Sequence, residues 1–81
     1  METGLKQAGV DVFDQAKRTL VVADLPGFCE EDVQLDLVDD LLSIFATQGN
    51  ITYYRIVKLH RRAEKIIGKV FSGGILEVIL G

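Results

Sequence analysis

The chain has 81 residues, of which 48% are hydrophobic and 26% charged, and its formal net charge is −3. This length fits one domain, and the apolar content is too high for a disordered chain. No run of about 18 apolar residues predicts a membrane-spanning helix, and residues 1–6 lack the apolar core of a secretory signal. The single cysteine, Cys29, has no second cysteine to pair with in the chain, which agrees with a reducing compartment. We therefore expect a cytoplasmic protein that does not act at a membrane.

The first predicted elements are two short strands, Val10–Phe13 and Thr19–Ala23, joined by a polar turn at residues 15–18. The second strand is almost continuously apolar, which is typical of a strand with little exposure. Pro26 ends it because proline has no backbone donor for a sheet, and Gly27 permits a sharp change of direction.

The middle of the chain continues as strands separated by short turns. Residues 33–38 alternate apolar and polar side chains, which is the period of a half-buried strand. Asp39-Asp40 predicts a two-residue turn, after which the strand Leu41–Thr47 runs back. Gln48-Gly49-Asn50 marks another turn, and the longest strand candidate, Ile51–Leu59, follows it.

The last third of the chain completes an all-β pattern. Residues 60–65 form a charged connection, and the strands Ile66–Phe71 and Ile75–Leu80 flank a Ser-Gly-Gly turn, which predicts a closing hairpin. About seven short strands without an amphipathic helix are typical of an immunoglobulin-like antiparallel β-sandwich. We place this domain at residues 10–81, after a short N-terminal segment, residues 1–9. The residues expected in its core are Leu20, Val22, Val33, Leu35, Ile44, Val57, Phe71, Leu76 and Val78.

No set of residues predicts catalysis, a cofactor or a metal site. A Cys29–His60 dyad lacks a residue that would orient it, and the acidic neighbours of Cys29 disfavour its thiolate. A zinc site would need paired Cys or His ligands, and the chain has one of each. The acidic run Glu30-Glu31-Asp32 lacks the ligand spacing of a calcium loop. We therefore expect no enzyme, no cofactor and no metal, so that function must come from a surface.

Charge is unevenly distributed along the chain. Residues 24–40 hold seven acidic side chains and no basic one, whereas residues 55–69 hold six basic side chains against Glu64. We favour two solvated faces that offset each other across strands over a dipolar surface that orients a partner. Nucleic-acid binding is a further alternative, which we do not favour because the chain is acidic overall. It would use Tyr53, Tyr54, Arg55, Lys58, His60, Arg61 and Arg62.

Two short segments resemble the two ends of the α-crystallin domain of small heat-shock proteins. Leu25-Pro26-Gly27 leads through an acidic turn into the strand that begins at Glu31-Asp32-Val33, and Gly74-Ile75-Leu76 opens the last strand. The resemblance covers about residues 10–80. It implies an immunoglobulin-like sandwich that acts as an ATP-independent chaperone domain and takes part in the stress response.

The resemblance also implies a partner site. In the family, the strands that match Val33–Val38 and Ile66–Phe71 border a groove, which receives a partner chain's extended Ile-x-Ile segment. The partners expected here are unfolding client proteins or extended apolar peptides. This chain departs from the family at Lys69, where alanine is usual, and at Gly73, where asparagine is usual. The groove candidates, each of which lies either in the groove or in the core, are Leu35, Leu37, Val38, Ile66, Gly68 and Val70.

Further departures bear on assembly. We expect the family's long N-terminal arm and its Ile-x-Ile tail to be missing. The loop that bacterial, archaeal and plant relatives exchange between subunits corresponds to Gln48–Thr52, which is too short to pair with another copy. In this respect the chain also resembles co-chaperone domains of the p-twenty-three type, so a co-chaperone or adaptor module without holdase activity is the alternative. We expect a monomer or a weak homodimer that uses strand edges, above all the strand Ile51–Leu59.

Overall fold

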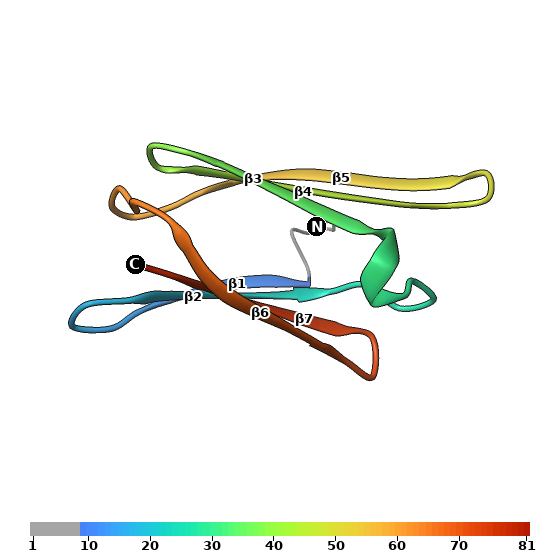
Figure 1. Cartoon of the computed structure of the whole chain (residues 1–81), viewed down its shortest axis with the longest axis horizontal. Coiled ribbons are helices and arrows are strands. Elements are labelled where there is room, and N and C mark those ends of the chain that lie inside the picture. Colours follow the sequence, from blue (N-terminus) through green and yellow to red (C-terminus); the bar gives the residue numbers. More distant parts are fainter. Residues whose placement is uncertain (1–8) are drawn as a thin grey trace, which may run out of the picture.

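The computed structural model describes residues 9–81, which form two antiparallel β-sheets packed face to face (Figure 1). The strands are β1 (Val10–Asp14), β2 (Thr19–Asp24), β3 (Val33–Val38), β4 (Leu41–Gln48), β5 (Ile51–Lys58), β6 (Ile66–Ser72) and β7 (Ile75–Leu80). One sheet has the order β1-β2-β7-β6, and the other has the order β3-β4-β5. A single 3-10 turn, η1 (Glu30–Asp32), precedes β3. The predicted all-β sandwich is confirmed, whereas the predicted segment 1–9 lies outside the described residues except for Gly9.

The core lies between the two sheets, and the alternation of each strand decides which side chains enter it. Val21 and Ala23 on β2 are paired with Val78 and Leu76 on β7, and all four side chains are fully buried. Removing such apolar surface from water is the main stabilising term of a domain of this size. The buried apolar residues are Val21, Ala23, Leu25, Val33, Leu42, Ile44, Ala46, Val57, Leu59, Leu76, Val78 and Leu80.

The core prediction was wrong for β2. Leu20 and Val22 are half-buried and point to the outer face of their sheet, where Val22 is paired with the exposed Glu77. An unbroken apolar run has no alternation from which the phase of the strand can be read. Pairing with β7 sets that phase, and it turns the residues at odd positions inward.

Two further core predictions need correction because the residues lie on edge strands. Leu35 on β3 and Phe71 on β6 face inward, but each is only half-buried because its strand has a neighbour on one side only. Both side chains still pack against the core cluster. The prediction is confirmed for Val33, Ile44, Val57, Leu76 and Val78.

The turns follow the predicted chemistry, with one difference. Asp39 has a φ of 56° in the two-residue turn between β3 and β4, a conformation that Asp tolerates better than most residues. The connection between β4 and β5 is only Gly49-Asn50, because Gln48 and Ile51 are already paired in the ladder. It is therefore shorter than the predicted loop at residues 48–52, and still less able to reach another copy.

Candidate peptide-binding edge site

The two segments that carry the resemblance meet at one corner of the sandwich. The Leu25 amide donates a hydrogen bond of 2.7 Å to the Gly74 carbonyl. Gly74 has a φ of 81°, and a Cβ there would lie 3.4 Å from the Pro26 Cα. Glycine at position 74 therefore allows the last hairpin to approach the corner closely. Of the remaining members, Gly27 and Ile75 are exposed, and Leu76 enters the core.

Asp32 holds the acidic turn that follows the corner. Its Oδ2 accepts hydrogen bonds from the Cys29 amide at 2.8 Å and from Gln48 Nε2 at 2.9 Å. The first bond caps η1, as a carboxylate three residues into such a turn commonly does. The second ties η1 to the end of β4. Sequence reasoning missed this second contact because it joins residues far apart in the chain, and only the tertiary fold brings them together.

The two strands predicted to border a groove are edge strands of different sheets. On β3, Leu35 and Leu37 are paired with the buried Ile44 and Leu42, so they face inward. On β6, Ile66 is paired with the buried Leu80 and also faces inward. These three side chains and Phe71 are half-buried and pack against the core. We call Leu35, Leu37, Ile66 and Phe71 the β3–β6 edge site.

The other three groove candidates lie on outer faces of the sheets. Val38 is paired with Leu41 and is 56% exposed, and Val70 is paired with Glu77 and is 52% exposed. Gly68 is paired with Ile79 on the same outer face as Val70. The structure therefore brings Leu35, Leu37 and Ile66 to the inner side of the edges and places Val38, Gly68 and Val70 on the far side of their strands.

A hollow of about 500 Å³ lies where the end of β3 meets the approach to β6. The Ala63 amide donates to the Asp39 carbonyl at 3.2 Å, and Arg62 Nη2 lies 2.8 Å from Asp39 Oδ1. These contacts hold the connection between β5 and β6 against the turn between β3 and β4. The hollow thus joins an apolar wall from Leu37 to charged groups at its rim; its lining residues are Leu37, Asp39, Arg62, Ala63 and Glu64.

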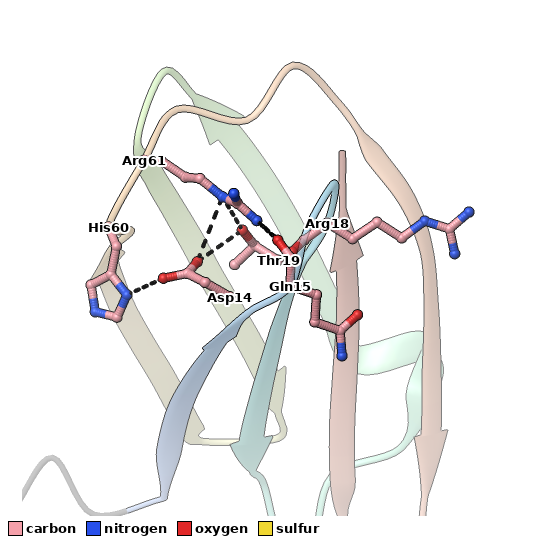
Figure 2. A network of polar contacts seen from close by, with 6 residues as sticks. All are labelled: Asp14, Gln15, Arg18, Thr19, His60 and Arg61. Carbon is pink, nitrogen blue, oxygen red and sulfur yellow. Dashed lines mark hydrogen bonds and ion pairs between the residues drawn. The ribbon is translucent and has the colours of Figure 1, made fainter.

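A polar network fastens the same connection to the β1–β2 hairpin, as Figure 2 shows. His60 Nδ1 donates to Asp14 Oδ2 at 2.5 Å, and Thr19 Oγ1 donates to Asp14 Oδ1 at 3.2 Å. Arg61 Nη2 donates to the carbonyls of Arg18, at 2.7 Å, and of Gln15. The His60 hydrogen bond is the main cause that lowers the pKa of Asp14 below its ordinary value. The network therefore links the two sheets through an ionised carboxylate.

The acidic and basic segments also meet at this end of the molecule. Lys58 forms an ion pair with Asp40, and Arg62 forms one with Asp39. The Lys58 hydrogen bond is the main cause that lowers the pKa of Asp40. These pairs support the interpretation in which the two charged segments offset each other.

The residues named for nucleic-acid binding do not share one surface. In the register with β4, Tyr53 and Arg55 are opposite the buried Ala46 and Ile44, whereas Tyr54 and Lys58 are on the other face of β5. Tyr54 makes an edge-on contact with Phe45, at 6.1 Å between ring centroids. His60, Arg61, Arg62 and Lys58 all contact acidic side chains.

Cys29 and His60 do not come together. Cys29 lies at the η1 end of the sandwich, and His60 follows β5 at the opposite end (Figure 1). Within residues 9–81, no three His, Cys, Asp or Glu side chains lie close enough to hold a metal ion. In that same part of the chain, no helix is long and apolar enough to cross a membrane.

No family model matches the sequence, and no curated protein matches it. Solved structures do match, each over 88% of this chain. Heat shock protein 16.0 from Schizosaccharomyces pombe is 25% identical, with a TM-score of 0.72 over 82% of its own length. A deletion mutant of hsp14.1 from Sulfolobus is 18% identical, with a TM-score of 0.79 over 71% of its length. A small heat-shock protein from Xylella fastidiosa is 20% identical, with a TM-score of 0.72 over 81% of its length. The described part of the chain is therefore an α-crystallin-like domain, with the fold of the small heat-shock proteins.

Proposed function

We propose that this domain is an ATP-independent chaperone domain that holds extended apolar segments of client proteins at the β3–β6 edge site. One observation carries the proposal: β3 and β6 are edge strands of their sheets, and both present half-buried aliphatic side chains, above all Leu35, Leu37 and Ile66. A strand edge offers main-chain donors and acceptors, and alternate side chains of an added strand fill apolar positions beside it.

The outer face of the β3-β4-β5 sheet supports the same class of function. Val38, Leu41, Tyr54 and Ile56 are between 40% and 59% exposed, and the register places all four on this face. Exposed apolar patches of this kind mark sites of protein interaction more often than chance surface. We infer that non-native clients contact this face in addition to the edge site.

The affinity for a short peptide is expected to be weak. Two aliphatic anchors are each worth up to about 1.5–3 kcal/mol when fully buried, and they must offset the ordering cost of a flexible peptide. A dissociation constant on the order of tens of micromolar or weaker follows. Titration with an Ile-Ser-Ile peptide, followed by backbone amide shifts, tests the site directly. Shifts should centre on β3 and β6, and the absence of any shift at millimolar peptide would remove the edge site from the proposal.

Holdase activity is tested by measuring whether the domain, without nucleotide, suppresses the aggregation of heated malate dehydrogenase. Leu37→Asn places an amide in the edge site, whereas Val38→Asn makes the same change one residue away on the outer face, and both variants are checked by circular dichroism. Protection should fall further in Leu37→Asn than in Val38→Asn. A chain that protects nothing but captures one defined partner is instead a co-chaperone or adaptor module, an alternative that the short Gly49-Asn50 connection favours.

A further inference from the structure

One cation lies on the inner side of the β3–β6 edge site. Lys69 on β6 is paired with Val78, and Phe71 with Leu76, and both partners on β7 are fully buried. Side chains opposite each other on antiparallel strands lie on the same face of the sheet. The stem of Lys69 therefore projects toward the space between the sheets, beside Phe71, while its side chain stays exposed at the edge.

A β-bulge gives Lys69 this orientation. Between Ile66 and Gly68 the ladder advances by two residues on β6 and by one on β7, which leaves Ile67 as the extra residue. Simple alternation from Ile66 would turn Gly68 and Val70 inward, but the bulge turns Lys69 and Phe71 inward instead. The strand thus presents an aliphatic residue, a cation and an aromatic residue to the same side.

Among the described residues, no acidic side chain forms an ion pair with this cation. Within residues 9–81, Lys69 takes part in none of the ion pairs at the end of β5 and in the β5–β6 connection, which use Lys58, His60, Arg61 and Arg62. Across the site β3 contributes the apolar Leu35 and Leu37, whereas Asp36 is paired with Ser43 on the outer face. A segment that docks beside Leu35 and Phe71 therefore meets an apolar wall and the ammonium group of Lys69, whereas Asp39, Arg62 and Glu64 lie at the rim beside Leu37.

We propose that the edge site selects extended apolar segments that carry an acidic side chain two places from an aliphatic anchor. In an extended segment, residues two apart point to the same side, so a carboxylate at that spacing faces Lys69 while the anchor enters the apolar site. A basic residue at the same position is repelled, which adds discrimination between segments. This inference rests on the proposed peptide-binding function and adds the chemical class of partner.

Three peptides test the charge preference: Ile-Ser-Ile flanked on each side by Ser and then by Glu, by Gln or by Lys. Dissociation constants are measured in low-salt buffer with the full chain. An exposed pair of opposite charges is worth a fraction of a kcal/mol to about 1 kcal/mol. The Glu peptide should therefore bind about two- to fivefold more tightly than the Gln peptide, and the Lys peptide more weakly. Added salt should compress these differences while leaving the Gln peptide little changed.

Charge reversal identifies the residue responsible. Lys69→Glu should invert the order of the three peptides, and Lys69→Gln should make their affinities equal within error. Lys17→Glu changes the net charge by the same amount in the exposed β1–β2 turn, and it should keep the original order. Equal affinities for the unmodified chain, or an order that persists in Lys69→Glu, overturn the charge preference while the edge site stands. If none of the three peptides binds, both the edge site and this inference fail.

Discussion

Asp14 is the residue on which the polar network depends, because it accepts hydrogen bonds from both His60 and Thr19. Its pKa in the folded chain is lowered from an ordinary value of 3.8, mainly by the His60 hydrogen bond. A carboxyl group with a lowered folded pKa stabilises the fold above its unfolded pKa, and this contribution is lost as pH falls through the folded value. The network is therefore expected to stabilise the sandwich at neutral pH and to fail in acid.

Asp14→Asn tests this linkage. The variant should unfold at lower urea concentration than the parent chain at pH 6. The gap should narrow as pH falls below 3.8, where Asp14 of the unfolded chain takes up a proton first, and it should close once pH falls through the lower pKa of the folded chain. Asp11→Asn, an exposed change on the same strand, serves as the control for lost charge. A gap that stays constant down to pH 2 would contradict the role assigned to the ionised carboxylate.

The backbone conformation of Gly74 should make this position sensitive to substitution. Its positive φ disfavours any side chain, and a Cβ would lie 3.4 Å from the Pro26 Cα, at the near limit of ordinary van der Waals contact. We expect Gly74→Ala to lower the free energy of unfolding by about 1–3 kcal/mol. Gly73 also has a positive φ, of 59°, but a Cβ there would lie in open space. Gly73→Ala should therefore lower the free energy of unfolding only by the backbone cost of about 1 kcal/mol. Urea denaturation measures both, and equal losses would show that the contact with Pro26 is unimportant.

Among the elements, β3 could be predicted in full and β2 and β6 only in part. The strict alternation of Val33, Leu35 and Leu37 reveals both the strand and its inward face. The unbroken run in β2 reveals a strand without its phase, which only pairing with β7 decides. The bulge in β6 cannot be read from its residues, because it depends on how two strands are aligned. For the same reason the sequence named six groove candidates but did not divide them between the inner and outer faces.

The phase of β4 gives a matched pair for a test at the element scale. Leu42 is fully buried between the sheets, whereas its neighbour Leu41 is 40% exposed on the outer face. Leu42→Ala should cost about 2–5 kcal/mol, because it removes apolar contacts and leaves a cavity. Leu41→Ala should cost less than about 1 kcal/mol, as most surface substitutions do. Chemical denaturation of both variants checks the assignment. Similar losses in the free energy of unfolding would show that the inward face of β4 is wrongly assigned.

At the scale of the whole molecule, turns and strand periods predicted the sandwich, and two short segments predicted its family likeness. These patterns could not predict the contacts between segments that are far apart in the sequence. The β5–β6 connection contacts the β1–β2 hairpin through Arg61 and the β3–β4 turn through Arg62. These contacts close one end of the sandwich beside the edge site, and each depends on the packing of the two sheets. The candidate site is thus made of predictable strands placed together by contacts that no local pattern encodes.

We expect this chain to associate only weakly with a second copy of itself. The Gly49-Asn50 turn is too short to exchange with another copy, so we expect association to use the free strand edges within residues 9–81. Among these, β5 has exposed Ile51, Tyr54 and Ile56 along its length. We expect sedimentation equilibrium to give a mass between those of one and two chains that rises with concentration. Ile56→Lys should shift it toward one chain because charge on an edge opposes pairing, whereas Val38→Lys on the opposite edge strand should not. A mass of twelve chains or more would contradict this view, because pairing of two β5 edges joins two chains and leaves neither β5 edge free for a third.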